Sequence, residues 1–547
     1  MNRTSGSEDR ATAGTVAPSG WRAWVADRLW VLLLLAVPIT SFPPLAEVAG
    51  GPVAPLAGIP AALLLVLVLP SWIRKGAHVP GISRPLLLFA VVAGLACALG
   101  LFYNLPTFLG ETALRREVRA LATLGVGLTF YLLAATLPQT ESARRKSLRW
   151  ISYGGAAMLA WATVQGVLMF AGGTIPWQLR EFHRLVSVRD MLSSRVVGLA
   201  YEPSWLGNQL VILYLPLWAA SVIRRTSSIS RAPERILPEL ILLVWGLAIL
   251  VLSKSRISLL SLLAVTFVVA LVWLWRRAER ALQRARPWIR HALGPALVVG
   301  LVVLSVGVVF TLGRFDTRLS RLFTLNLAAL RDSSTPFYHL ANELAYAERV
   351  MYWESGIGVF SRYPVFGVGL GNTGLLFPQT VPSFGFALPE IIRILEGAPQ
   401  FPNPKSLWIR LLAETGLVGF LFFVTWLALT AEAARRVVRH STSAAGVIGL
   451  AALFALGAQI VEGFSLDTFA LPQLWLILGM ATAASFRLDR YESGAPGGSD
   501  RHEPAAVSIG SNEIDKPDDQ AAHQAPLPDD VGIRRSMRGS ERASWNR

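Results

Sequence analysis

Long apolar runs separated by short basic clusters constrain this chain more than any other feature. A helix needs about 20 apolar residues to cross a bilayer, and the 547-residue sequence contains roughly twelve such runs. They are centred near Leu34, Leu64, Val92, Gly127, Ala160, Tyr214, Leu247, Val265, Val302, Phe422, Leu453 and Ile477. The sequence therefore predicts an all-α polytopic membrane protein with about 12 transmembrane helices within residues 23–486.

The composition excludes several other classes of protein. Hydrophobic residues make up 53% and charged residues 16% of the chain, whereas soluble domains contain about a quarter charged residues. A soluble enzyme and a disordered regulator are therefore excluded. The single cysteine, Cys97, cannot form an internal disulfide or a cysteine-rich zinc site. The sequence also shows no metal-ligand cluster and no nucleotide-binding motif, so we expect neither metal nor cofactor.

The basic clusters predict the orientation of the chain in the membrane. Lys and Arg in short loops stay on the cytoplasmic side, and five clusters all follow even-numbered apolar runs. They are Arg74 and Lys75; Arg144, Arg145, Lys146 and Arg149; Arg224, Arg225, Arg231 and Arg235; Arg276, Arg277, Arg280, Arg284, Arg286 and Arg290; and Arg435, Arg436 and Arg439. We therefore predict that both termini are cytoplasmic. This bias accounts for the net charge of +16, and no nucleic-acid partner is expected.

Three stretches are not predicted to span the membrane. Residues 1–22 and 487–547 are polar, and the second stretch is rich in Gly, Pro, Asp, Ser and Arg, so we expect disordered cytoplasmic tails. The first apolar run has no small-residue cleavage site behind it and is interpreted as a retained anchor. Residues 313–406 lie outside the cytoplasm by the parity of the runs. Their aromatic residues, charges and glycines indicate a folded cap, and a loop of this length is usually functional.

Unusual polar residues gather at the predicted outer ends of the runs. The charged ones are Arg195, Glu202, Lys254, Arg256, Arg349, Glu354 and Lys405. Together they form a cationic surface with a few carboxylates at headgroup depth. Such a surface suits a lipid-linked pyrophosphate, because arginine binds phosphate oxygens bidentately. Each residue also has an ordinary interpretation: a single arginine snorkels to headgroups, and the Glu202-Pro203 pair begins a helix.

Aromatic residues, a histidine and a glycine run complete the candidate site. Tyr201, Trp205, Tyr352 and Trp353 offer stacking faces for sugar rings, with an interfacial aromatic belt as the alternative. The run Gly367-Val-Gly369-Leu-Gly371 is a phosphate-binding loop or an ordinary turn, and it lacks the context of a dinucleotide-binding fingerprint. His339 is a general base or a packed surface histidine. These alternatives stay open at the level of sequence.

At these residues the chain resembles the O-antigen polymerase and ligase family of bacterial envelope glycan enzymes. The family's Arg-x-x-Gly and polar–Pro elements match Arg195 to Ser204, and its Ser-Arg element matches Ser255-Arg256. Its Arg-x-x-x-Trp and Pro-x-x-Gly-x-Gly segments match Arg349 to Trp353 and Pro364 to Gly369. Its His-Asn pair, nine residues before Gly-x-x-Gly, is replaced by Lys405-Ser406, with Gly416 and Gly419 in register. The resemblance covers residues 195–420.

The resemblance implies a metal-independent, integral-membrane glycosyltransferase of the C class in the bacterial cytoplasmic membrane, with its active face extracytoplasmic. Its substrate would be an undecaprenyl-pyrophosphate-linked glycan, with membrane lipids and a chain-length regulator or flippase of the same pathway as partners. In the ligase branch the histidine is the proposed base or acceptor-positioning group. Because Lys405 replaces it, the sequence favours a polymerase of oligosaccharide repeat units over a ligase that transfers the finished glycan to a lipid, protein or wall acceptor.

Roles follow for the candidate residues within this resemblance. Arg349, Arg195 and Arg256 are expected to stabilise the leaving pyrophosphate, and Glu202 is the first choice for the general base, followed by Glu354 and His339. Lys254, Lys405, Tyr201, Trp353 and Gly369 are expected to bind substrate. A transporter of polysaccharide or of lipid-linked oligosaccharide is the rival from another class. It would place polar sites at the bilayer midplane, often within repeated halves, and no repeat is evident in the sequence.

Overall fold

The computed structural model describes residues 20–75, 80–172, 175–230, 237–281, 287–314, 320–324, 336–344, 346–398 and 400–492. All of them belong to one compact unit, Met1–Gly497. These residues form helices joined by turns, with three isolated β-bridges. The expected tails, 1–22 and 487–547, lie almost wholly outside the described residues, as do Arg231, Arg235, Arg284 and Arg286 of the basic clusters.

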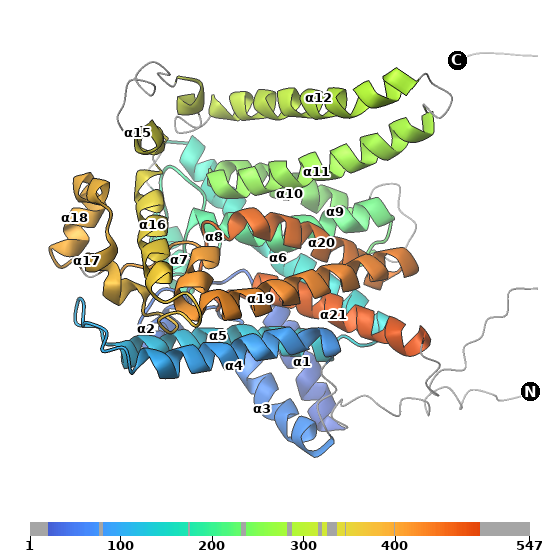
Figure 1. Cartoon of the computed structure of the whole chain (residues 1–547). Helices are drawn as coiled ribbons and strands as arrows, with labels where there is room; N and C mark the ends of the chain where they lie inside the picture. The colour runs from blue at the N-terminus through green and yellow to red at the C-terminus, as the bar shows by residue number, and fades with distance from the viewer. Residues whose placement is uncertain are drawn as a thin grey trace, which may run out of the picture. The chain divides into compact units, whose positions relative to one another are not determined.

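All twelve predicted centres fall within helical segments (Figure 1). These are α1 (Trp21–Ala36), α3 (Gly58–Lys75), α4 (Arg84–Gly100), α5 (Ala113–Thr136), α6 (Glu141–Phe170), α8 (Pro203–Gln209) with η2 (Leu210–Tyr214) and α9 (Leu215–Arg224), α10 (Pro238–Ser253), α11 (Arg256–Ala281), α12 (Pro287–Gly313), α19 (Leu407–His440), α20 (Ala444–Glu462) and α21 (Pro472–Glu492). Shorter helices lie between them: α2 (Pro43–Ala49), α7 (Trp177–Val186), α15 (Pro336–Glu343), α16 (Ala347–Arg362), α17 (Phe377–Thr380) and α18 (Pro389–Leu395).

Many of these helices are apolar enough to cross a membrane. Within the described ranges, eight helical segments have the required length and composition: 81–100, 113–136, 141–170, 203–224, 256–280, 294–311, 407–440 and 444–462. Three shorter apolar helices, at 58–74, 238–253 and 472–486, fall below that length, and α1 has 16 residues. The chain is therefore an all-helical, polytopic integral membrane protein. The expectation of about 12 spans would also require α1 and these three shorter helices to cross the membrane.

The helical segment formed by α8, η2 and α9 runs through the middle of the bundle. Its most apolar window is 83% buried within the protein. The helix widens to a π-turn at η2, where the Leu215 N–H bonds to the Leu210 carbonyl. Pro216 follows, and because proline has no N–H it cannot bond to the carbonyl four residues earlier. Tyr214 and Trp218 fit against Gly155 of α6, where a Cβ would lie 2.7 Å from the tyrosine ring.

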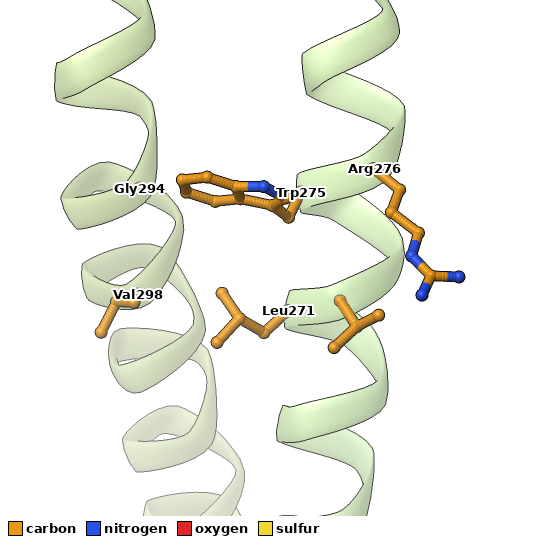
Figure 2. A pocket seen from close by; sticks show the side chains of 6 residues that line it. Leu271, Trp275, Arg276, Gly294 and Val298 are labelled. Atoms are coloured by element: carbon orange, nitrogen blue, oxygen red, sulfur yellow. The ribbon is translucent and has the colours of Figure 1, made fainter. Parts of the chain in front are cut away.

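Helices α11 and α12 form a hairpin, and among the described residues α12 contacts little besides α11. The apolar window of α12 is 0% buried within the protein, and Figure 1 shows α12 beside α11 at the edge of the bundle. An apolar groove of about 370 Å³ lies between the two helices. In Figure 2 the Trp275 ring lies over Gly294, and Arg276, which also lines the groove, extends its guanidinium away from α12. The exposed valines of α12 suit lipid tails rather than water.

The two ends of the bundle differ in chemistry. At one end, called the arginine end, Lys146 contacts Asp27 at 2.5 Å, Arg149 donates to the Ser228 carbonyl at 2.9 Å, and Arg224 donates to the Val438 carbonyl. These contacts join the starts of α1 and α6 to the ends of α9 and α19. The predicted cytoplasmic clusters around Arg144, Arg224 and Arg435 thus share one end of the bundle, although which face of the membrane it meets stays a prediction.

The opposite end, called the cap end, carries the described part of the long loop. Helices α15 to α18 gather there (Figure 1), and we call them the cap. They have an apolar core of their own, formed by Ala341, Ala347, Val350, Met351, Tyr352, Phe377, Leu388, Ile391 and Ile394. Phe108 and Leu109, from the connection between α4 and α5, pack against it. The described part of the 313–406 loop is therefore folded and anchored to the bundle.

Candidate functional site

Arg195 is fixed against the C-terminal end of α10. Its Nε donates to the Ser253 carbonyl at 3.0 Å, and its Nη2 donates to the Lys254 carbonyl at 3.1 Å. Carbonyls at this end of a helix have no intrahelical partner, and the helix dipole favours a cation there. Lys254 adopts a left-handed conformation with φ 50°. Arg195 and Lys254 are thus held together at the cap end.

Glu202 lies immediately before α8, and its side chain accepts hydrogen bonds from an arginine and a serine. Its Oε1 accepts a hydrogen bond from Arg189 Nη1 at 3.0 Å, and its Oε2 accepts one from Ser204 Oγ at 3.0 Å. Pro203 occupies the first turn of α8, as a proline at a helix start predicts. The Arg189 guanidinium also lies 5.4 Å from the Tyr201 ring. Glu202 is therefore paired and 38% exposed, and its role as a base stays a prediction.

A buried polar network beneath this surface joins four helices. Asn208 of α8 donates from Nδ2 to Glu462 Oε2 at 2.9 Å and accepts from Gln473 Nε2 at 2.7 Å. The other Glu462 oxygen accepts from Ser261 Oγ of α11 at 3.3 Å. Glu462 ends α20 and is fully buried, so these bonds offset the loss of carboxylate hydration. They fix α8, α11, α20 and α21 to one another at the cap end.

Close packing of α8 on α11 places Arg256 at the same end. A Cβ on Gly207 would lie 2.4 Å from Ser258 Oγ, so only glycine permits this approach without a shift. Arg256, at the first position of α11, donates from Nη1 to the Leu344 carbonyl at 2.7 Å. Its guanidinium lies 4.7 Å from the centroid of the Tyr346 ring. Arg256 therefore connects the bundle to the segment between α15 and α16.

Arg349 reaches from cap helix α16 to two segments of the bundle. Its Nη1 donates to the Lys405 carbonyl at 3.4 Å and to the Ser465 carbonyl at 3.3 Å. Within the described ranges, its Nε and Nη2 have no hydrogen-bond partner. Ser465 lies one turn beyond Glu462, and Arg349 and Glu462 interact electrostatically. Arg349 thus joins the cap to the buried network and keeps donors for a ligand.

Lys405 links the cap to the start of α19. Its Nζ lies 2.6 Å from Glu390 Oε1 and 4.2 Å from the centroid of the Tyr352 ring, and the Tyr352 hydroxyl donates to the same Oε1 at 2.8 Å. The Lys405 backbone has φ 47°, and its N–H donates to Asn403 Oδ1 at 3.1 Å. Burial acts to raise the pKa of Glu390, but the hydrogen bond and charge of Lys405 outweigh it and hold the pKa below its usual 4.5.

The Lys405–Glu390 pair predicts a pH-dependent contribution to stability. At about pH 7, Lys405→Met should lower the free energy of unfolding by about 1 kcal/mol, because the side chains are 26% and 29% exposed and water screens part of their attraction. The pKa of Glu390 is lower in the folded state, so this stabilisation is present above pH 4.5 and is lost as the pH falls through the folded-state value. Unfolding midpoints in detergent at about pH 7 and about pH 3 test this; an equal difference at both would contradict it.

The glycine run is a tightly packed turn between α5 and α19. Gly367, Gly369 and Gly371 have φ values of 70°, 91° and 85°, a region that favours glycine. The Gly369 N–H donates to the Glu414 carbonyl at 3.0 Å, and a Cβ on Gly369 would lie 2.7 Å from Glu117 Oε1. Backbone conformation and close packing thus account for the glycines. The substrate-binding role of Gly369 stays a prediction.

The remaining predicted residues lie in the cap. The Trp353 ring contacts Phe464 with centroids 5.6 Å apart, and its Nε1 is buried without a hydrogen-bond partner in the described part of the chain. Both Glu354 oxygens accept from the Tyr338 hydroxyl, at 3.2 and 3.0 Å. His339 is half-buried on α15. Glu354 is therefore engaged inside the cap, whereas Trp353 packs toward the bundle.

These contacts bring most of the predicted charged residues to one end of the bundle. Lys254, Arg256 and Glu202 lie at helix ends around the buried network, and Arg195 lies in the loop that packs against the end of α10. Arg349 and Lys405 join the cap to this region. Arg195, Arg256 and Arg349 do not line the α11–α12 groove. They also do not line a second cavity of about 30 Å³, whose lining includes Asn208, Gln459 and Gln473. That second cavity has room for a water molecule.

Several residues of the cap end escaped the sequence analysis. Glu462 and Glu117 are carboxylates at or near the ends of apolar runs, and such a position is itself a signal of a partner or a function. Glu390 had no such signal, because it lies in the long predicted loop outside the apolar runs and its partner Lys405 is 15 residues away. A group of three or more His, Cys, Asp or Glu residues able to hold a metal ion is absent from the described residues.

Comparison with known proteins gives one family. The model of the family described as O-antigen ligase matches residues 241–424, which run from α10 through the cap to the middle of α19. Among curated proteins, none matches the chain. The matched segment contains Lys254, Arg256, Arg349 and Lys405, and it ends before Glu462.

Proposed function

We propose that this chain, whose residues 241–424 belong to the O-antigen ligase domain family, polymerises undecaprenyl-pyrophosphate-linked oligosaccharide repeat units into a surface polysaccharide. Enzymes of this family polymerise or ligate lipid-linked glycans. In the proposed reaction an acceptor hydroxyl attacks the anomeric carbon of the donor glycan. The bond from that carbon to the diphosphate oxygen breaks, and the electron pair leaves with the diphosphate.

The observation that carries the proposal is the hydrogen bonding of Arg349. Arg349 reaches from the cap toward the bundle with Nε and Nη2 unpartnered among the described residues, while Nη1 donates to two carbonyls. An arginine held in this way can stabilise charge as it develops on the leaving diphosphate without reorganising first. Its attachment to Lys405 and Ser465 prevents the guanidinium from simply swinging out to lipid headgroups.

Arg195, Lys254 and Arg256 support the same role from the bundle side. Lys254 and Arg256 lie at helix ends at the cap end, and Arg195, in the loop before α8, is oriented against the end of α10 by two backbone carbonyls. A diphosphate carries more than one negative charge, so several fixed cations stabilise it better than one. We assign these residues to diphosphate binding, and Tyr201 and Trp353 to contacts with the sugar rings.

A polymerase is favoured over a ligase by the residue at position 405. Lysine stands where the ligase branch has its histidine, and its amine is engaged by Glu390 rather than free to accept a proton. The active face would be extracytoplasmic, because the cap end lies opposite the arginine end. Transfer of a finished glycan to a lipid acceptor is the alternative that the experiment separates.

The experiment uses the purified protein in lipid vesicles with undecaprenyl-pyrophosphate-linked oligosaccharide as the sole glycan. Wild-type protein should produce a ladder of polymer, and Arg349→Ala should reduce its rate about a hundredfold or more. Arg362→Ala is the matched control, because Arg362 lies on the same helix, is exposed and bonds only to Gln379 among the described residues. It should leave the rate unchanged.

Two results would overturn the proposal. If Arg349→Ala and Arg195→Ala both leave polymer length and yield unchanged, these arginines do not stabilise the leaving group. If the wild-type protein forms no ladder but moves a preassembled glycan onto an added lipid acceptor, it is a ligase. Equal amounts of folded protein, measured by gel filtration in detergent, are required for each comparison.

A further inference from the structure

The cap contains a carboxylate that the sequence analysis did not identify and that the fold holds beside the predicted site. Glu390 lies in the first turn of α18 (Pro389–Leu395). Both contacts made to it by the described residues involve one oxygen: Lys405 Nζ at 2.6 Å and the Tyr352 hydroxyl at 2.8 Å both reach Oε1. Oε2 accepts no hydrogen bond from the described residues and is not buried. One oxygen is therefore fixed while the other is available.

The surroundings of Glu390 keep it both ionised and accessible. Its side chain is 29% exposed, so a ligand can reach it without unfolding the cap. Burial alone would raise the pKa of this carboxyl, but the Lys405 ammonium and the Tyr352 hydroxyl hold it below the usual value. Arg393, on the same helix, acts in the same direction. At neutral pH the group is a carboxylate that can accept a proton.

Lys405 connects this carboxylate to the cation assigned to the diphosphate. Its side chain binds Glu390, whereas its backbone carbonyl accepts from Arg349 Nη1 at 3.4 Å. The Lys405 backbone is held in the left-handed conformation by Asn403 on one side. On the other side Ser406 caps α19 and donates to the Gly463 carbonyl at 3.1 Å. Lys405 therefore contacts both the Glu390 carboxylate, through its side chain, and the Arg349 guanidinium, through its carbonyl, and so fixes the position of each.

The carboxylates expected from the sequence are engaged differently. Each oxygen of Glu202 accepts a hydrogen bond, from Arg189 and from Ser204. Both oxygens of Glu354 accept from the Tyr338 hydroxyl. Of these three, Glu390 alone combines a free oxygen with a connection to Arg349.

We propose that Glu390 is the catalytic base for the acceptor and that Lys405 is its positioning residue. The assignment rests on the proposed function. As the acceptor oxygen bonds to the anomeric carbon, its proton passes to Glu390 Oε2, and the diphosphate departs with its electron pair beside Arg349. Lys405, which replaces the histidine of the ligase branch, therefore positions the base Glu390 and is not itself the base.

The test compares variants in the vesicle polymerisation assay. Glu390→Gln should lower the turnover rate by about 10²–10⁴ with little change in KM, and Glu390→Ala should respond to added formate, a small carboxylate that can fill the space left. Glu396→Gln is the matched control: it removes a carboxylate that is exposed at the end of the same helix, and it should keep the wild-type rate. Glu202→Gln tests the competing assignment.

The outcomes separate failure of this assignment from failure of the proposed function. Loss of polymer in Glu390→Gln, at the wild-type unfolding midpoint and with formate rescue of Glu390→Ala, supports the assignment. Wild-type rates in Glu390→Gln overturn it, as does a large loss in Glu202→Gln alone. A loss that follows a lowered unfolding midpoint and resists formate also overturns it, because the role is then structural. If the wild-type protein itself makes no polymer, the proposed function fails, and this assignment with it.

Discussion

Glu414→Ala should destabilise the protein by about 3–5 kcal/mol, because it leaves the buried Arg410 guanidinium without the carboxylate that contacts it directly. Glu414 Oε2 lies 2.8 Å from Arg410 Nε, and the two side chains are only 2% and 12% exposed. Arg410 also donates to the Asp467 carbonyl at 2.6 Å, and Glu414 accepts from Thr373 Oγ1 at 3.3 Å. The pair therefore joins α19 to Asp467, in the segment after α20, and to Thr373, two residues after the glycine run.

The prediction is checked by thermal unfolding in detergent, followed by circular dichroism. The exposed pair Glu432–Arg435 lies on the same helix, 46% and 47% exposed, so Glu432→Ala should leave the midpoint unchanged. A double replacement, Arg410→Met with Glu414→Met, should recover part of the loss, because it removes both members of the buried ion pair instead of one. An unchanged midpoint for Glu414→Ala would show that water reaches Arg410 in the folded protein.

Gly416→Ala should cost about 3 kcal/mol or more and disturb the junction between α19 and the cap. Gly416 has φ 63° and ψ −170°, a conformation that is essentially restricted to glycine. A Cβ there would also lie 2.2 Å from the Val365 carbonyl oxygen. The kink turns the Leu417 N–H toward the Pro364 carbonyl, which it reaches at 2.8 Å. Strain and overlap with the backbone therefore act together.

Gly125→Ala on α5 is the matched control. Gly125 does not have a positive φ, and a Cβ there would meet nothing within 4 Å. Alanine is the better helix former, so this variant should be as stable as wild type or slightly more stable. If Gly416→Ala unfolds at the same temperature as Gly125→Ala, the α19 kink tolerates a side chain and the packing described here is wrong.

Hydropathy located the helices because it depends on local sequence. Each predicted centre, from Leu34 to Ile477, lies in a helical segment, since an apolar run that must satisfy its own backbone groups forms a helix whatever its neighbours are. Lengths were less predictable. α10 ends after 16 residues, where Lys254 adopts a left-handed backbone conformation. α8 gives way to a π-turn before Pro216, which has no N–H to continue the helical hydrogen bonds. These backbone features interrupt the helices within apolar sequence.

The motifs around Arg195, Arg256, Arg349 and Lys405 could be found in the sequence, and their shared end of the bundle followed from counting spans. The hydrogen-bond partners of the polar residues at this end of the bundle could not be predicted. Asn208 and Glu462 are 254 residues apart, and no periodicity links them. Burial removes their hydration, so each needs the other once the helices pack.

The sequence by itself determined an all-helical membrane protein, a likeness to glycan polymerases and ligases, and a cationic end of the bundle. Only the tertiary structure decided which charges are paired: Lys405 with Glu390, Arg410 with Glu414, and Arg349 with backbone carbonyls. Helix formation follows from contacts within a few residues, whereas the pairing of charges depends on how distant segments meet and how much water remains between them.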